Sequence, residues 1–164
     1  ELISKTRELP YSVDELTKLT VLESNNYFGL LEKIEPLPGL VDLLDKLVSA
    51  RIPLAVATSS DAVTMQNILE KSGLRKYFRF TVCRDDVARS KPEPDVFLLA
   101  AKLLEVPPEN CLVFEDSKNG IKAAKAAGMF CIAYSGGNSG QQDQTQADRR
   151  IAHFNELEID HFLK

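Results

Sequence analysis

The sequence has few of the residues that build disulfide frameworks or zinc sites, since it contains three cysteines and two histidines. Cys83, Cys111 and Cys131 lie far apart, and each is in or beside an apolar run. A disulfide framework or a structural zinc site would need closely spaced cysteines or neighbouring histidines. We therefore expect three buried thiols in a reducing compartment.

Long apolar runs and a concentration of positive charge are also missing. No stretch approaches the roughly 18 apolar residues that a membrane-spanning helix needs, and no basic and apolar leader opens the sequence. The net charge is −4, and the basic residues are dispersed. Because nucleic-acid-binding proteins present a concentrated basic patch, we expect neither nucleic acid nor a membrane as a partner, and we expect a cytoplasmic protein.

The sequence does contain a regular alternation of helical and strand patterns. Apolar residues at helical spacing in 40–48 and from Asp95 onward alternate with short apolar runs at 54–57, 111–114 and 129–134. Such an alternation predicts the α/β class, with a Rossmann-like parallel sheet sandwiched by helices. The segment 135–147 is rich in Gly, Gln, Asn and Ser, which predicts a flexible loop before a short final strand at 151–154.

The helical pattern at the start of the sequence ends at residues 36–39. Residues 1–35 have a helical pattern, and the stretch 12–15 resembles a capping box. The Pro-Leu-Pro-Gly stretch at 36–39 cannot continue a helix. We therefore predict two parts, a helical unit at 1–35 and an α/β core at 36–164.

Polar groups follow the predicted strands at the points where these end. Thr58 and Ser59 follow the run at 54–57, Glu115 and Asp116 follow the run at 111–114, and Lys91 lies in a proline-rich loop. The carboxyl ends of parallel strands share one edge of a sheet, where ligands bind. Paired carboxylates suit Mg²⁺, hydroxyl and N–H groups at a helix start bind phosphate oxygens, and a lysine neutralises developing charge. Together these groups favour phosphoryl chemistry.

Each group also has a purely structural interpretation, which the sequence leaves open. A carboxylate such as Asp116 stabilises the N-terminus of a following helix, and serine or threonine before a helix is often only its cap. Ser117 is expected to cap the helix that follows the two acids. A loop lysine is often solvated.

Residues 36–134 resemble the haloacid dehalogenase-like superfamily of phosphatases and phosphomutases, in particular the subgroup around β-phosphoglucomutase and phosphoglycolate phosphatase. The segments LAVATSS at 54–60, SKPEPD at 90–95 and LVFEDSKNGI at 112–121 resemble its second, third and fourth motifs. The resemblance implies that Thr58 and Ser59 bind phosphate and that Lys91 pairs the phosphate with the nucleophile. It also implies that Asp116 ligates Mg²⁺ and that Glu115 supports the metal shell.

The first motif of that superfamily is an apolar strand ending in Asp-x-Asp, and the sequence contains no Asp-x-Asp. In the superfamily the first aspartate forms the aspartyl-phosphate and the second is the general acid/base. Because this motif precedes the cap there, and the sequence opens with Glu1, we expect 1–35 to be the C-terminal part of a helical cap. We also expect a complementing N-terminal segment, without which the chain is inactive, and a monomer when the protein is complete.

The resemblance implies a Mg²⁺-dependent phosphomonoester hydrolase that acts on a small phosphorylated metabolite. A sugar-phosphate mutase of the β-phosphoglucomutase type uses the same core residues and stays open. A non-catalytic domain that binds phosphate and metal without a nucleophile also stays open. A flavodoxin-like receiver domain does not account for the Lys91 loop.

The missing motif also leads to a prediction about strand pairing. In the superfamily, the strand that carries the first motif lies between the two strands that match 54–57 and 112–114. We therefore expect these two strands to lie in one parallel sheet about two strand spacings (~9–10 Å) apart, without direct hydrogen bonds.

Overall fold

The computed structural model describes residues 34–158 of the chain. The chain divides into two compact units, Glu1–Glu35 and Pro36–Lys164. The interpretation of 1–35 as part of a helical cap, with a capping box at 12–15, falls almost wholly outside the described residues and stays a prediction. Among the helices of the described part, none is long and apolar enough to cross a membrane.

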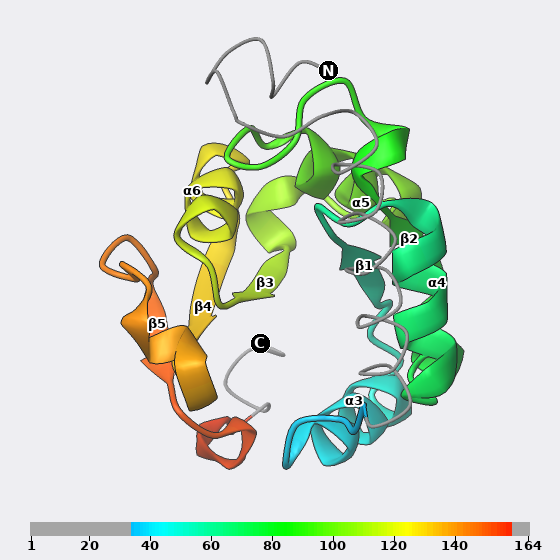
Figure 1. The fold of residues 1–164 in the computed structure, drawn as a ribbon, viewed down its shortest axis with the longest axis vertical. Helices are drawn as coiled ribbons and strands as arrows, with labels where there is room; N and C mark the ends of the chain where they lie inside the picture. The colour runs from blue at the N-terminus through cyan, green and yellow to red at the C-terminus, as the bar shows by residue number, and fades with distance from the viewer. Residues whose placement is uncertain (1–33, 159–164) are drawn as a thin grey trace, which may run out of the picture. The chain divides into compact units, whose positions relative to one another are not determined.

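The described residues form short parallel strands in two sheets (Figure 1). The strands are β1 (Ala55–Ala57), β2 (Phe80–Val82), β3 (Leu112–Glu115), β4 (Phe130–Tyr134) and β5 (Arg149–Ile151). β1 pairs with β2, and β4 lies between β3 and β5. The prediction of parallel strands is confirmed for every pair that these residues form.

Helices connect the strands, as the apolar periodicity predicted. The α-helices are α3 (Leu40–Ser49), α4 (Ala62–Lys71), α5 (Asp95–Leu104) and α6 (Lys118–Ala126). The 3₁₀ helices are η1 (Arg75–Tyr77), η2 (Arg84–Asp86), η3 (Pro108–Asn110), η4 (Gly137–Gln141) and η5 (Phe154–Glu156). α5 packs against β1 and β2, α6 packs against β3 and β4, and α5 also contacts α6.

β4 is buried on both faces over residues 131–133, because successive side chains of a strand point in opposite directions. In β4, Cys131 and Ala133 join a core cluster with residues of α5 and α6. Ile132, between them, joins a second cluster with Leu43 of α3 and Phe154 of η5. Helices therefore cover both faces, which confirms the α/β class.

No backbone pairing joins β1 to β3 within residues 34–158. This confirms the prediction that these two strands are not hydrogen-bonded to each other. The prediction of a single sheet is wrong for the described residues, which form two sheets. The physical reason is that no strand among residues 34–158 lies between them to pair with both edges.

Three local predictions need correction. The Ser/Thr cluster at 58–60 does not cap α4, because Asp61 is the N-cap and accepts the Thr64 N–H at 2.9 Å. Cys83 and Cys131 are buried, but Cys111 is only half-buried, since it lines a cavity beside β3. The last strand, β5, lies earlier than predicted, and residues 154–156 form the 3₁₀ helix η5 instead.

Candidate active site

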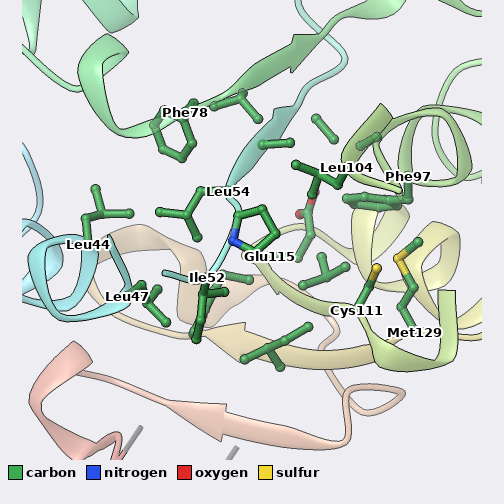
Figure 2. Close-up of a pocket in the computed structure, with 18 of the residues that line it drawn as sticks. Leu44, Leu47, Ile52, Leu54, Phe78, Phe97, Leu104, Cys111, Glu115 and Met129 are labelled. Atoms are coloured by element: carbon green, nitrogen blue, oxygen red, sulfur yellow. The ribbon is translucent and has the colours of Figure 1, made fainter. Parts of the chain in front are cut away.

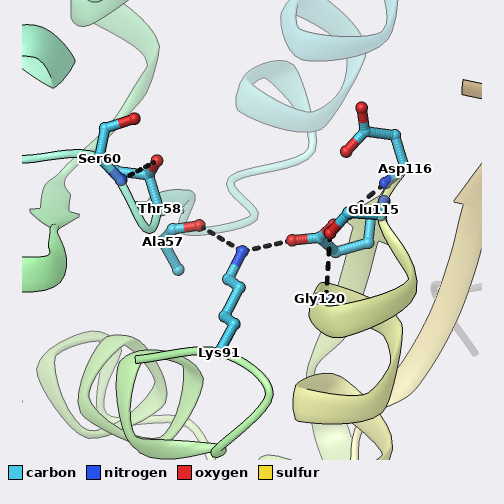
Figure 3. A network of polar contacts seen from close by, with 8 residues as sticks. Ala57, Thr58, Ser60, Lys91, Glu115, Asp116 and Gly120 are labelled. Carbon is cyan, nitrogen blue, oxygen red and sulfur yellow. Dashed lines mark hydrogen bonds and ion pairs between the residues drawn. The ribbon is translucent and has the colours of Figure 1, made fainter. Parts of the chain in front are cut away.

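Lys91 connects the carboxyl ends of β1 and β3 (Figure 3). Its Nζ donates a hydrogen bond to the carbonyl oxygen of Ala57 at 3.1 Å and forms an ion pair with Glu115. The Lys91 and Glu115 side chains are only 9% and 8% exposed. The Lys91 ammonium also lies 4.5 Å from the ring centroid of Phe97, a cation–π distance. The interpretation of Lys91 as a solvated loop lysine is therefore wrong.

The Glu115 carboxylate is held on both oxygens. Oε1 faces Lys91, and Oε2 accepts the N–H groups of Asp116 and Ser117 at 3.1 and 3.2 Å. The Ser117 hydroxyl donates a third hydrogen bond to Oε2 at 3.0 Å. With its orientation fixed in this way, Glu115 in turn fixes where the Lys91 ammonium lies.

Gly120 makes room for that carboxylate. A Cβ atom at position 120 would lie 2.0 Å from the Glu115 Cδ and 2.1 Å from each carboxylate oxygen. Gly120 lies in the first turn of α6, where its N–H is bonded to the Ser117 hydroxyl at 3.0 Å. Only glycine therefore fits beside Glu115 in this backbone, and Ser117 is the N-cap, as predicted.

Asp116 differs from its neighbour in being exposed. Its Oδ2 accepts a hydrogen bond from the Ser139 hydroxyl at 3.3 Å, and its main-chain carbonyl accepts one from the amide of Gln144 at 3.0 Å. Among the described residues no N–H of α6 donates to the Asp116 carboxylate, so its role is not that of a helix cap. The exposed carboxylate is free to meet a ligand.

Thr58 follows β1 directly, and its N–H extends the pairing with β2 by donating to the carbonyl of Val82 at 2.9 Å. The Thr58 Oγ1 accepts the Ser60 N–H at 3.1 Å. Within residues 34–158 the Thr58 hydroxyl hydrogen has no acceptor, so this group can donate to a phosphate oxygen. Ser59 is exposed beside it.

A cavity of about 560 Å³ lies between the facing edges of β1 and β3. Its walls are mainly apolar, and Figure 2 shows Leu44, Leu54, Phe97 and Met129 around it. Glu115 lines it as well, at the carboxyl end of β3. The cavity therefore runs between two strand edges toward the polar cluster around Lys91.

Comparison with known proteins identifies the family. Residues 4–128 match the family described as haloacid dehalogenase-like hydrolase. This chain belongs to that family. The strand-end cluster of Thr58, Lys91 and Asp116 thus lies in the part of the sequence that the family accounts for.

Two curated relatives of this chain have different enzyme names, one a phosphatase and one a mutase. Fructose-1-phosphate phosphatase YqaB of Escherichia coli (strain K12) is 48% identical over 103 residues, which are 63% of this chain and 54% of that protein. β-Phosphoglucomutase of Bacillus subtilis (strain 168) is 34% identical over 139 residues, 83% of this chain and 61% of that protein. The chain thus spans little more than half the length of these relatives.

Solved structures of the haloacid dehalogenase-like hydrolases have the same fold. CbbY from Rhodobacter sphaeroides in complex with phosphate superposes with a TM-score of 0.77 at 32% identity. The alignment covers 92% of this chain and 68% of that one. The likeness confirms the predicted superfamily and its α/β fold.

The site residues fit Mg²⁺ only in part. Among residues 34–158, no cluster of three or more His, Cys, Asp or Glu side chains could enclose a metal ion. The exposed Asp116 carboxylate is a suitable ligand, since Mg²⁺ usually keeps several waters and takes one or two carboxylates together with substrate phosphate. The oxygens of Glu115 are already bonded to Lys91 and to the turn, so its role in supporting a metal shell stays a prediction.

The sequence did not reveal the roles of two residues of this site. Gly120 lies within the segment at 112–121 that resembles the fourth motif, but nothing in the sequence indicated that it packs against the Glu115 carboxylate. Gln144 lies in a segment that was predicted to be a flexible loop, yet it is 2% exposed and bonded to Asp116. Its neighbours along the chain are polar and exposed, so composition gave no signal for it.

Proposed function

We propose that the protein containing this chain is a Mg²⁺-dependent phosphatase that acts on a small phosphorylated metabolite through an aspartyl-phosphate. The observation that carries the proposal is the bridge from Lys91 to Ala57 and Glu115. It holds a buried ammonium at the shared end of β1 and β3, beside Thr58 and Asp116. The relatives named as phosphatases of sugar phosphates and related compounds support this class of substrate.

Each residue has a definite part in the proposed reaction. Lys91 donates one N–H to Ala57 and one to Glu115, and its third N–H is left for an oxygen of the phosphate or of the attacking carboxylate. The Thr58 hydroxyl and the Ser59 N–H hold phosphate oxygens, and Asp116 ligates Mg²⁺. When bound, the metal ion offsets negative charge on the transferring phosphoryl group.

The nucleophile comes from outside this chain segment in our proposal, since the sequence contains no Asp-x-Asp. We place it on a complementing N-terminal segment that enters the cavity between β1 and β3 as a strand. Cys111 O accepts the Phe130 N–H at 3.2 Å, so the alternation of a parallel ladder directs the main-chain groups of Leu112 and Phe114 toward the other, open edge.

Energetics support such a strand. Buried backbone N–H and C=O groups are nearly always paired, and each unpaired group costs about 1–3 kcal/mol. An inserted strand would pair with β1 and β3 at once, and its side chains would meet the apolar walls of the cavity. A carboxylate at its C-terminal end would then lie beside Lys91, which supplies the opposite charge.

The function is tested by Asp116→Asn in the complete protein. We expect the variant to lose Mg²⁺-dependent hydrolysis of p-nitrophenyl phosphate while its circular dichroism spectrum is unchanged. Asp42→Asn is the matched control, because Asp42 is an exposed carboxylate on α3, outside the site. Equal activity of both variants would contradict the proposal.

The inserted strand is tested separately by amide hydrogen exchange. The N–H groups of Ala55, Leu112 and Phe114 should exchange slowly in the complete protein and much faster in the isolated chain 1–164. The N–H of Cys131, which is buried in β4 and donates to the Asp148 carboxylate at 2.7 Å, is the internal control and should be protected in both. Fast exchange of the three edge amides in both proteins would rule out the strand.

A sugar-phosphate mutase is the second candidate, because the relatives include β-phosphoglucomutase. The two reactions differ in the product, which is inorganic phosphate for the phosphatase and an isomeric sugar phosphate for the mutase. A non-catalytic domain that binds phosphate and metal predicts neither product. Product analysis by ³¹P NMR distinguishes the three.

We also propose that the complete protein is cytoplasmic and monomeric.

A further inference from the structure

Gln144 is a buried polar residue in the segment between β4 and β5, with 2% of its surface exposed. Its Nε2 lies 3.0 Å from the carbonyl oxygen of Asp116, 2.8 Å from that of Tyr134 and 3.2 Å from that of Ser139. These carbonyls belong to three separate places, namely the turn after β3, the end of β4 and the 3₁₀ helix η4. One amide therefore ties together the segments that surround Asp116.

The side-chain amide of Gln144 is not fully hydrogen-bonded, so hydrogen bonding alone does not account for its buried position. An amide NH₂ has two hydrogens, so it serves three carbonyl oxygens incompletely. The Gln144 Oε1 is also buried and has no hydrogen-bond partner among the described residues. A buried unpaired acceptor costs free energy, and hydrogen bonds that specify a core usually satisfy every member.

The same segment also reaches the side chain of Asp116. The Ser139 hydroxyl donates to Asp116 Oδ2 at 3.3 Å, and the Ser139 carbonyl accepts from Gln144. Asp143, the residue directly before Gln144, forms an ion pair with Lys118 in the first turn of α6. Gln144 thus lies at the centre of contacts that restrict both the backbone and the carboxylate of Asp116.

We propose that Gln144 is a positioning residue that orients the Asp116 carboxylate for a divalent cation. It acts through the main chain of Asp116 and through Ser139, and it does not itself touch the cation. Groups that orient a metal ligand typically change metal affinity or activity by 10–100-fold when they are removed. The inference rests on the proposed function, since it takes Asp116 as the ligand.

The test is a calorimetric titration of the complete protein with MgCl₂. Gln144→Met keeps the volume and apolar reach of the side chain but removes the amide. We expect its Mg²⁺ affinity to be weaker by about 10–100-fold. A cooperative urea unfolding transition would show that the variant is folded. Gln142→Met is the matched control, because Gln142 is exposed two residues away. A folded Gln144→Met variant with the affinity of the control would overturn the inference.

A second measurement needs no substitution and keeps the inference testable if Gln144→Met does not fold. In the wild-type protein, the side-chain NH₂ resonances of Gln144 should shift during the MgCl₂ titration. The apparent dissociation constant from these shifts should equal the one obtained from the backbone N–H resonance of Asp116. The Gln142 side-chain resonances should not move. Unmoved Gln144 resonances during saturation of the Asp116 site would contradict the inference.

Failure of the inference can be told apart from failure of the proposed function. If Asp116→Asn leaves Mg²⁺ binding unchanged, then Asp116 is not the ligand and the proposed function fails with it. If Asp116→Asn removes binding whereas Gln144→Met binds like Gln142→Met, then only the role of Gln144 is wrong.

Discussion

The Lys91 ammonium contacts the carbonyl oxygen of Ala57 and the carboxylate of Glu115, so one cation connects two strand ends that share no backbone pairing. Both charged side chains are nearly buried. A buried charge without its partner is costly, because the protein interior solvates it poorly. The pair therefore matters for stability as well as for phosphate binding.

Lys91→Ala should accordingly destabilise the protein, because it leaves the Glu115 carboxylate buried without its cation. We expect a loss of about 3–5 kcal/mol in the free energy of unfolding, measured by urea denaturation. Lys122→Ala is the control, since Lys122 is exposed on α6. Equal stability of the two variants would show that Lys91 contributes no buried pairing energy.

Gly120→Ala should also destabilise the protein, although alanine normally favours a helix over glycine by about 1 kcal/mol. The added Cβ would overlap the Glu115 carboxylate, and overpacking of this kind costs about 1–3 kcal/mol. The effect is measured as a change in the urea midpoint.

A double-mutant cycle isolates the cause of the Gly120 effect. Glu115→Ala removes the carboxylate that the new methyl group would meet. In that background, Gly120→Ala should be neutral or stabilising. If the cost persists without Glu115, the close approach to this carboxylate is not its origin.

Asp61 should stabilise α4 as its N-cap, because its carboxylate accepts both the N–H and the hydroxyl of Thr64 at 2.9 and 3.0 Å. Asp61→Ala removes these acceptors and should lower the thermal midpoint, whereas Asp61→Asn should keep it close to wild type, since asparagine caps as well as aspartate. Equal midpoints for the two variants would contradict the capping role.

The stability of the protein should depend on pH through Asp148. Partial burial by itself raises the pKa of this carboxyl, but hydrogen bonds from Lys125 and from the Cys131 N–H hold it below its usual 3.8. A lowered pKa in the folded state stabilises the protein above 3.8, and this contribution is lost as the pH falls through the folded-state pKa.

The pH effect is checked by urea denaturation at about pH 7 and at successively lower pH below 3.8. Asp148→Asn should be less stable than wild type at neutral pH, and the difference should shrink in acid. Asp42→Asn, an exposed position on α3, serves as the control. A stability difference that is the same at every pH would show that the Asp148 charge does not contribute.

Much of the fold was predictable because it depends on local patterns. The apolar run before Glu115 became β3, Ser117 capped α6, and the helix from Asp95 began where expected. Such features require only neighbouring residues, since strand periodicity, caps and proline breaks act within a few positions of the chain. The motifs at Thr58, Lys91 and Asp116 were visible for the same reason.

Contacts between distant segments were decided only by the tertiary structure. The sequence shows an aspartate, a lysine and a glutamine in three loops, but not that Lys91 meets Glu115 or that Gln144 meets Asp116. Nor does a glycine at 120 reveal that a carboxylate occupies the space beside it. Local composition determined which groups stand at the strand ends. Which of them are buried, paired or exposed depends on how separate segments pack, because burial and partner choice are properties of the whole core.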